Sequence, residues 1–166
     1  MLYVLTFLVS IVLANLSVAY FGPPSIIFNA FILIGLDLSL RDKLHETWHN
    51  KGLAWKMTAL VVASGIVTYL LNQGAGKIAI ASVIAFCGSM IVDAIVYQVL
   101  IRKSKLVKMN GSNLFSAAVD SILFPTIAFG VFMPWIILGQ FAAKVGGGFI
   151  WSVILTRYIA PRRERR

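Results

Sequence analysis

Charge is scarce in this chain, and acidic charge is the scarcest. Only 13% of its 166 residues are charged, and 6 aspartates and glutamates stand against 15 lysines and arginines. Soluble domains carry about a quarter of charged residues, whereas 59% of this sequence is hydrophobic. A soluble domain is therefore excluded, and the composition predicts an integral membrane protein in contact with the lipid bilayer.

Cysteine is nearly absent, and so are the features of a secreted protein. The one cysteine, Cys87, lies in an apolar run and can form no internal disulfide. No basic segment precedes the first apolar run, so we expect no cleavable signal peptide. The formal net charge is +9, and the basic residues responsible for it lie between the apolar runs and at the tail. This distribution is typical of membrane topology signals and does not indicate a nucleic-acid partner.

The apolar runs predict six membrane spans within a single domain, residues 1–166. Gly22-Pro23-Pro24 separates the first two runs. Residues 109–143 would form a helix of about 52 Å, longer than the hydrocarbon core of about 30 Å, so we place a break at Met133-Pro134. The predicted spans cover residues 2–20, 25–44, 53–71, 78–101, 111–132 and 134–159.

The basic residues support this count. With six spans, both basic connectors and the basic tail fall on one side and Lys77 alone on the other, whereas five or seven spans would scatter them. Basic loops are typical of the cytoplasmic side. The sequence therefore predicts an all-α integral membrane protein with six transmembrane helices and both termini in the cytoplasm.

Asp37 stands inside the second apolar run, and Arg41 follows one helical turn later on the same face. A carboxylate near the end of a membrane helix is costly unless it is paired, faces a wet cavity or serves a function. Two interpretations are open at this point: an ion pair that anchors the helix end, or a gate or ligand-facing pair.

Three more ionisable residues are predicted near the membrane midplane. Asp93 lies eight residues from the cytoplasmic end of span 78–101, and Asp120 lies about nine residues into span 111–132 from the same side. Lys144 lies about 15 Å deep in the last span. Each would cost about 2.5–3.5 kcal/mol in isolation on insertion scales. Two acids and one base leave a carboxylate in excess, which favours a cavity for a small molecule over a structural salt bridge.

Two of these aspartates share a local pattern. In both spans a serine stands four residues before the aspartate and an aromatic residue four after it: Ser89, Asp93 and Tyr97, and Ser116, Asp120 and Phe124. Such inverted repeats occur at transporter binding sites, although coincidence in an apolar sequence is the alternative. Gln140 shares a helix face with Lys144, and Asn29 is a further candidate for a ligand contact. The glycines at 146–148 allow close approach of a helix or a ligand.

One motif points elsewhere. His45 and His49 fit the H-E-x-x-H pattern of zinc proteases, but both lie in a connector and no third ligand is evident. No nucleotide-binding loop or nucleophile elbow appears. We therefore expect no metal, no cofactor and no enzymatic activity.

Together these segments resemble a known family. The resemblance is carried by Asp37-Leu-Ser-Leu-Arg41, by Ala81-Ser82 through Ser89 and Asp93 to Tyr97, by Ser112-Asn113 through Ser116, Asp120-Ser121 and Ile127-Ala128-Phe129, and by Lys144. The chain is similar to the queuosine-precursor transporters, a vitamin-uptake-transporter-like (VUT) family of bacterial six-span proteins. The similarity covers most of the length from the second span onward, and the compact chain would suit a phage-encoded member.

The resemblance implies import of 7-cyano- or 7-aminomethyl-7-deazaguanine across the bacterial inner membrane, or across the host cell membrane for a phage-encoded protein. It also implies a topology similar to the substrate-binding subunits of ECF vitamin transporters. The alternative is such a subunit for another vitamin-like molecule, dependent on ATPase partners. A holin-like phage protein is a third class, which the converging charges disfavour. The oligomeric state is left open.

The chemistry of this ligand class matches the residues. A deazaguanine presents two N–H donors that a carboxylate can accept, beside a carbonyl acceptor. We expect Asp93 and Asp120 to face one cavity with Lys144, and at least one aspartate to bind that edge. The predicted substrate-binding residues are Asn29, Ser89, Asp93, Tyr97, Asn113, Ser116, Asp120, Gln140 and Lys144, with Asp37 and Arg41 as a gate or ion pair.

Overall fold

The structure, a computed structural model, describes residues 2–48, 52–103 and 105–154, and this part of the chain is helical without any strand. The prediction of an all-helical fold is thereby confirmed. The elements are α1 (Leu2–Phe21), α2 (Ser25–Asn29), η1 (Ala30–Ile34), α3 (Gly35–Trp48), α4 (Leu53–Leu71), η2 (Gln73–Ala75), α5 (Gly76–Val99), α6 (Lys105–Phe129) and α7 (Pro134–Ile154).

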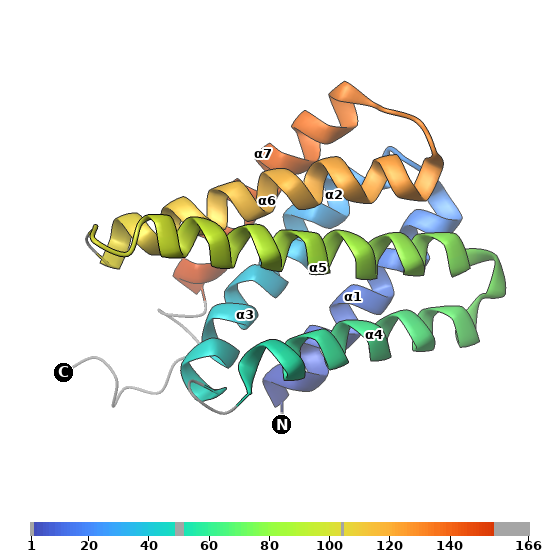
Figure 1. The fold of residues 1–166 in the computed structure, drawn as a ribbon. Helices are drawn as coiled ribbons and strands as arrows, with labels where there is room; N and C mark the ends of the chain where they lie inside the picture. The colour runs from blue at the N-terminus through green and yellow to red at the C-terminus, as the bar shows by residue number, and fades with distance from the viewer. Residues whose placement is uncertain (1, 49–51, 104, 155–166) are drawn as a thin grey trace.

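The helices form a bundle in which the chain turns back at each connector (Figure 1). The ends of α3 and α5 lie at one end of the bundle with the start of α1, and the turns after α1, α4 and α6 lie at the other. Arg102 and Lys103 are consequently at the opposite end from Lys77. This charge segregation is what the six-span topology requires; the span count and the cytoplasmic orientation stay predictions.

The protein is a multi-pass membrane protein. Four segments of the described residues are long and apolar enough to cross a bilayer: Leu2–Phe21, Ala54–Leu71, Gln73–Val99 and Gly111–Phe129. With 21 residues, α7 also has the length of a span. Large apolar side chains are exposed along the bundle, and Tyr20, Trp55 and Trp135 are exposed near helix ends, where aromatic residues meet the membrane interface.

The second predicted span is a single helical path with a π-helical turn, η1, in its middle. In a regular α-helix, Asn29 and Asp37, eight residues apart, would differ by about 80° around the axis. A π-turn accommodates one extra residue, which reduces that difference to about 20°. Both side chains therefore lie on the same face, toward the interior of the bundle.

Glycines let α7 cross this path at backbone distance. A Cβ on Gly147 would lie 2.2 Å from the carbonyl oxygen of Phe31 in η1, and one on Gly35 would lie 2.7 Å from the carbonyl carbon of Gly147. No larger residue fits either position without a shift of backbone. Small residues at a helix crossing are typical of membrane bundles, so the close approach here is made to a helix.

Two apolar clusters hold the bundle together. One contains Val18, Ile26, Ile78, Ala81, Ala85, Phe124 and Ala128. The other contains Phe7, Ile11, Leu40, Leu44, Met57 and Val61. Side chains from both clusters border a cavity in the middle of the bundle.

Candidate binding cavity

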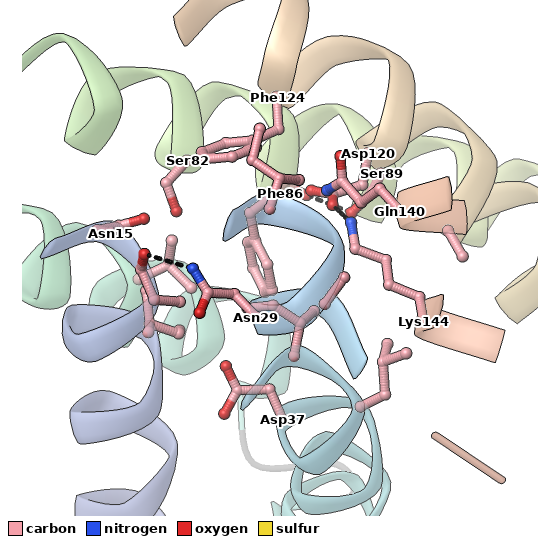
Figure 2. Close-up of a pocket in the computed structure, with 18 of the residues that line it drawn as sticks. Asn15, Asn29, Asp37, Ser82, Phe86, Ser89, Asp120, Phe124, Gln140 and Lys144 are labelled. Carbon is pink, nitrogen blue, oxygen red and sulfur yellow. Dashed lines mark hydrogen bonds and ion pairs between the residues drawn. The ribbon is translucent and has the colours of Figure 1, made fainter. Parts of the chain in front are cut away.

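The central cavity has an apolar wall interrupted by polar side chains from α1, α2, α3, α5, α6 and α7 (Figure 2). The aromatic rings of Phe86 and Phe124 also border it. The polar lining consists of Asn15, Asn29, Asp37, Arg41, Ser82, Ser89, Ser116, Asp120, Gln140 and Lys144. An apolar cavity with a few placed polar groups is the usual form of a small-molecule site.

Asp120 and Lys144 form an ion pair across α6 and α7 at one side of the cavity (Figure 2). The Lys144 side chain is only 2% exposed, against 24% for Asp120. Gln140, one turn before Lys144, is buried, and its Oε1 has no hydrogen-bond partner within the described residues. The structure thus brings together three of the predicted residues and leaves one acceptor free.

Asp37 lies elsewhere along the cavity, on the side of α1 and away from the Asp120–Lys144 pair (Figure 2). Its Oδ1 accepts a hydrogen bond from the Ser10 hydroxyl. Its Oδ2 is buried, and no group of the described chain donates to it. The side chain as a whole is 5% exposed.

Arg41 does not pair with Asp37, contrary to one of the two interpretations of this turn. Its guanidinium donates to Oδ1 of Asn113 on α6 at 3.1 Å, and among the described residues no ion pair joins it to Asp37. The reason lies in the packing, because α1 offers Ser10 to Asp37 and α6 offers Asn113 to Arg41. Each residue links α3 to a different helix.

Asp93 and Tyr97 are not where the repeated pattern predicted them. Neither borders the central cavity, and Tyr97 is 36% exposed. α5 and α6 pack antiparallel, with Gly88 beside Leu123 and Gly111 beside Leu100. Asp93 lies one helical turn beyond Ser89, the last residue of α5 that borders the cavity. The expectation of one cavity containing both aspartates is therefore wrong.

The remaining predicted residues present acceptors. Ser89 donates to the carbonyl of Phe86 at 2.8 Å, and Ser116 donates to that of Asn113 at 3.1 Å. Asn29 donates to the carbonyl of Ala14 at 3.3 Å. Because these donors are used by the backbone, the hydroxyl and amide oxygens retain lone pairs for a ligand. The cavity is consequently rich in acceptors.

Sequence reasoning did not select several cavity residues as site residues. Asn15 borders the cavity from the first span, where it is the one strongly polar side chain. Ser10 of the same span is not part of the lining but donates to Asp37. Phe86 stands three residues before Ser89, a spacing that places both on one face of α5. Helical spacing from a chosen polar residue was the signal that could have found it.

A second cavity adjoins the first between α3, α6 and α7. Arg41 and Lys144 border both cavities, while Asn113 borders only the second. The Arg41–Asn113 hydrogen bond therefore lies at the boundary of the two cavities. Its position is consistent with a gate, which stays a prediction.

The structure offers little on the zinc motif. His49 and the side chain of His45 fall outside the described residues. Within the described part, no group of three or more histidine, cysteine, aspartate or glutamate residues is placed to hold a metal.

The fold and cavity define a multi-pass helical membrane protein with an internal cavity lined in part by polar side chains. A protein-family comparison agrees with this class: the family described as "Putative vitamin uptake transporter" matches residues 1–160. The chain belongs to the vitamin uptake transporter family, which confirms the family resemblance and fits a role other than catalysis. Neither the comparison with curated proteins nor that with solved structures gives a match.

Proposed function

We propose that this protein imports queuosine precursors, 7-cyano- or 7-aminomethyl-7-deazaguanine, across the bacterial inner membrane. The observation that carries the proposal is a cavity with buried polar atoms that lack partners. Oδ2 of Asp37 and Oε1 of Gln140 both border it without a hydrogen bond from the described residues. An unpaired buried polar group costs about 1–3 kcal/mol, which a ligand with N–H donors would relieve.

The lining suits a flat heterocycle with donors on its edge and one carbonyl. Lys144 has three N–H donors, and one of them is used by Asp120. The ammonium can therefore also donate to a ligand carbonyl. Phe86 and Phe124 supply aromatic surface for the ring plane. A guanine-like base needs these three elements together: acceptors for N–H groups, a donor for the carbonyl and an apolar surface for the ring.

The second cavity supports a route through the protein. It adjoins the binding cavity at Arg41 and Lys144, and Arg41 lies in the part of α3 that leads to the basic end of the bundle. With that end in the cytoplasm, a ligand released from Lys144 would leave past the Arg41–Asn113 hydrogen bond. Opening of this bond would be the release step.

The proposal can be tested by measuring the queuosine content of tRNA. The chain is expressed in cells that lack both precursor synthesis and ECF ATPase modules, and the medium contains either precursor. We expect queuosine to reappear in tRNA, with none in cells that carry the empty vector. Restoration only when ATPase modules are supplied would show instead that the chain is a substrate-binding subunit.

A further inference from the structure

We infer that Asp37, rather than Asp120, accepts the two adjacent N–H donors of the ligand's guanine-like edge. The inference rests on the proposed function and names the group that sets its specificity for the 2-amino group. It assigns to Asp37 a ligand contact in place of an ion pair with Arg41.

The partners and positions of the three aspartates considered as site residues lead to this assignment. Asp120 is held by the Lys144 ammonium, and Asp93 lies outside the cavity. Asp37 borders the cavity, is 5% exposed and has no basic partner in contact among the described residues. A carboxylate buried in this way requires donors from elsewhere.

The geometry at Asp37 leaves the right acceptors free. A carboxylate has about four lone-pair positions on two oxygens. Ser10 uses one position on Oδ1, and Oδ2 uses none. Each oxygen can still accept one of two parallel N–H groups, the arrangement that a guanine N1–H and 2-amino group present. Because Ser10 also fixes the orientation of the carboxylate, we regard it as a positioning residue.

The π-turn supports the same assignment. It brings Asp37 onto the helix face of Asn29, toward the cavity. Without η1 the carboxylate would lie about 80° further around the axis than Asn29. π-turns of this kind occur frequently at functional sites.

The test compares two ligands that differ in one group. Equilibrium binding to purified full-length protein is measured for 7-cyano-7-deazaguanine and for its analogue without the 2-amino group. The analogue leaves one acceptor of Asp37 unpaired, so wild type should prefer the 2-amino compound by about 5- to 150-fold. Asp37→Asn offers a donor where an acceptor is needed, so its preference should fall close to one.

Asp93→Asn is the matched control, the same substitution on a helix of the same bundle but outside the cavity. It should keep the wild-type preference. Ser10→Ala keeps the carboxylate but frees its orientation, so it should lower the preference while binding persists. If Asp37→Asn does not accumulate, Ser10→Ala decides, and an unchanged preference in that variant would overturn the inference.

Other outcomes are equally decisive. An undiminished preference in Asp37→Asn overturns the inference. If it comes with an equal loss of affinity for both compounds, it would indicate that Asp37 binds a proton or another cation instead. A wild type that binds the precursors without preference for the 2-amino group also overturns it. Failure of wild type to bind either compound would instead refute the proposed function.

Discussion

Lys144 and Asp120 form an ion pair whose two members are unequally buried. The lysine side chain is 2% exposed and the aspartate side chain 24%. Removing Asp120 leaves a fully buried ammonium without its counter-charge, whereas removing Lys144 leaves a carboxylate that partly reaches the cavity or solvent. The loss of one partner from a buried pair costs about 3–5 kcal/mol. The cost is larger when the charge that remains is the more buried of the two.

We therefore predict that Asp120→Asn destabilises the protein more than Lys144→Gln does. The double variant should lose less than the sum of the single variants, because neither charge is then stranded. Thermal unfolding of the purified proteins in one detergent measures all three. The pairing would be contradicted if the two single variants lost equal stability and the double variant lost the sum of the two.

The crossing of α7 and η1 gives a second prediction. Gly147→Ala places a Cβ 2.2 Å from the Phe31 carbonyl oxygen, whereas Gly146→Ala meets only the edge of the Phe31 ring at 3.9 Å. Overpacking costs about 1–3 kcal/mol or more where backbone must move. Gly147→Ala should lower membrane abundance and thermal stability, and Gly146→Ala should leave both near wild type. Matched behaviour of the two variants would show that α7 does not cross here.

Arg41 should couple to Asn113 more strongly than to Asp37. The Arg41–Asn113 hydrogen bond measures 3.1 Å, and interacting residues give coupling energies of about 0.5–3 kcal/mol in double-mutant cycles. We expect a value in that range for Arg41→Gln with Asn113→Ala, and a smaller one for Arg41→Gln with Asp37→Asn. Precursor uptake and thermal stability supply the two readouts. Additive effects in the Asn113 cycle would refute the interhelical bond.

The orientation can be tested separately. Basic connectors are retained on the cytoplasmic side, so with six spans both termini should lie in the cytoplasm. A reporter that works only in the cytoplasm should therefore be active at either terminus. A reporter that requires the opposite side should be silent at both termini. Activity of that reporter at one terminus would show that the termini lie on opposite sides, and hence that the number of spans is odd rather than six.

Composition and helical spacing were sufficient for the class of fold and for part of the cavity. Few charges and long apolar runs predicted helices in a membrane, and a shared helix face placed Gln140 beside Lys144. Asp120 was predicted near Lys144 because a lone charge in a membrane interior requires a partner.

The errors have physical causes. Asp93 continues the helix face of Ser89 one turn beyond the end of the cavity, and α6 begins six residues earlier than the apolar run that predicted it. Polar residues at a helix start extend the helix without raising its hydropathy, so hydropathy alone misses them. The partners of Asp37 and Arg41 depended on which helices flank α3, and the π-turn lies where Gly147 approaches the backbone of Phe31. The identity of the flanking helices leaves no local signal in the sequence. The glycines at 146–148 indicated a close approach, but not that its partner is η1.

Counterflow in reconstituted vesicles tests the central claim most directly. Vesicles that contain the purified chain and no other protein are loaded with unlabelled 7-aminomethyl- or 7-cyano-7-deazaguanine and diluted into labelled precursor. Exchange through a carrier needs no energy source, so we predict transient accumulation of label that an excess of external unlabelled precursor abolishes, and none in protein-free vesicles. Equal label in both kinds of vesicle, with the chain folded and inserted, would contradict the proposal that this protein alone carries the precursor across the membrane.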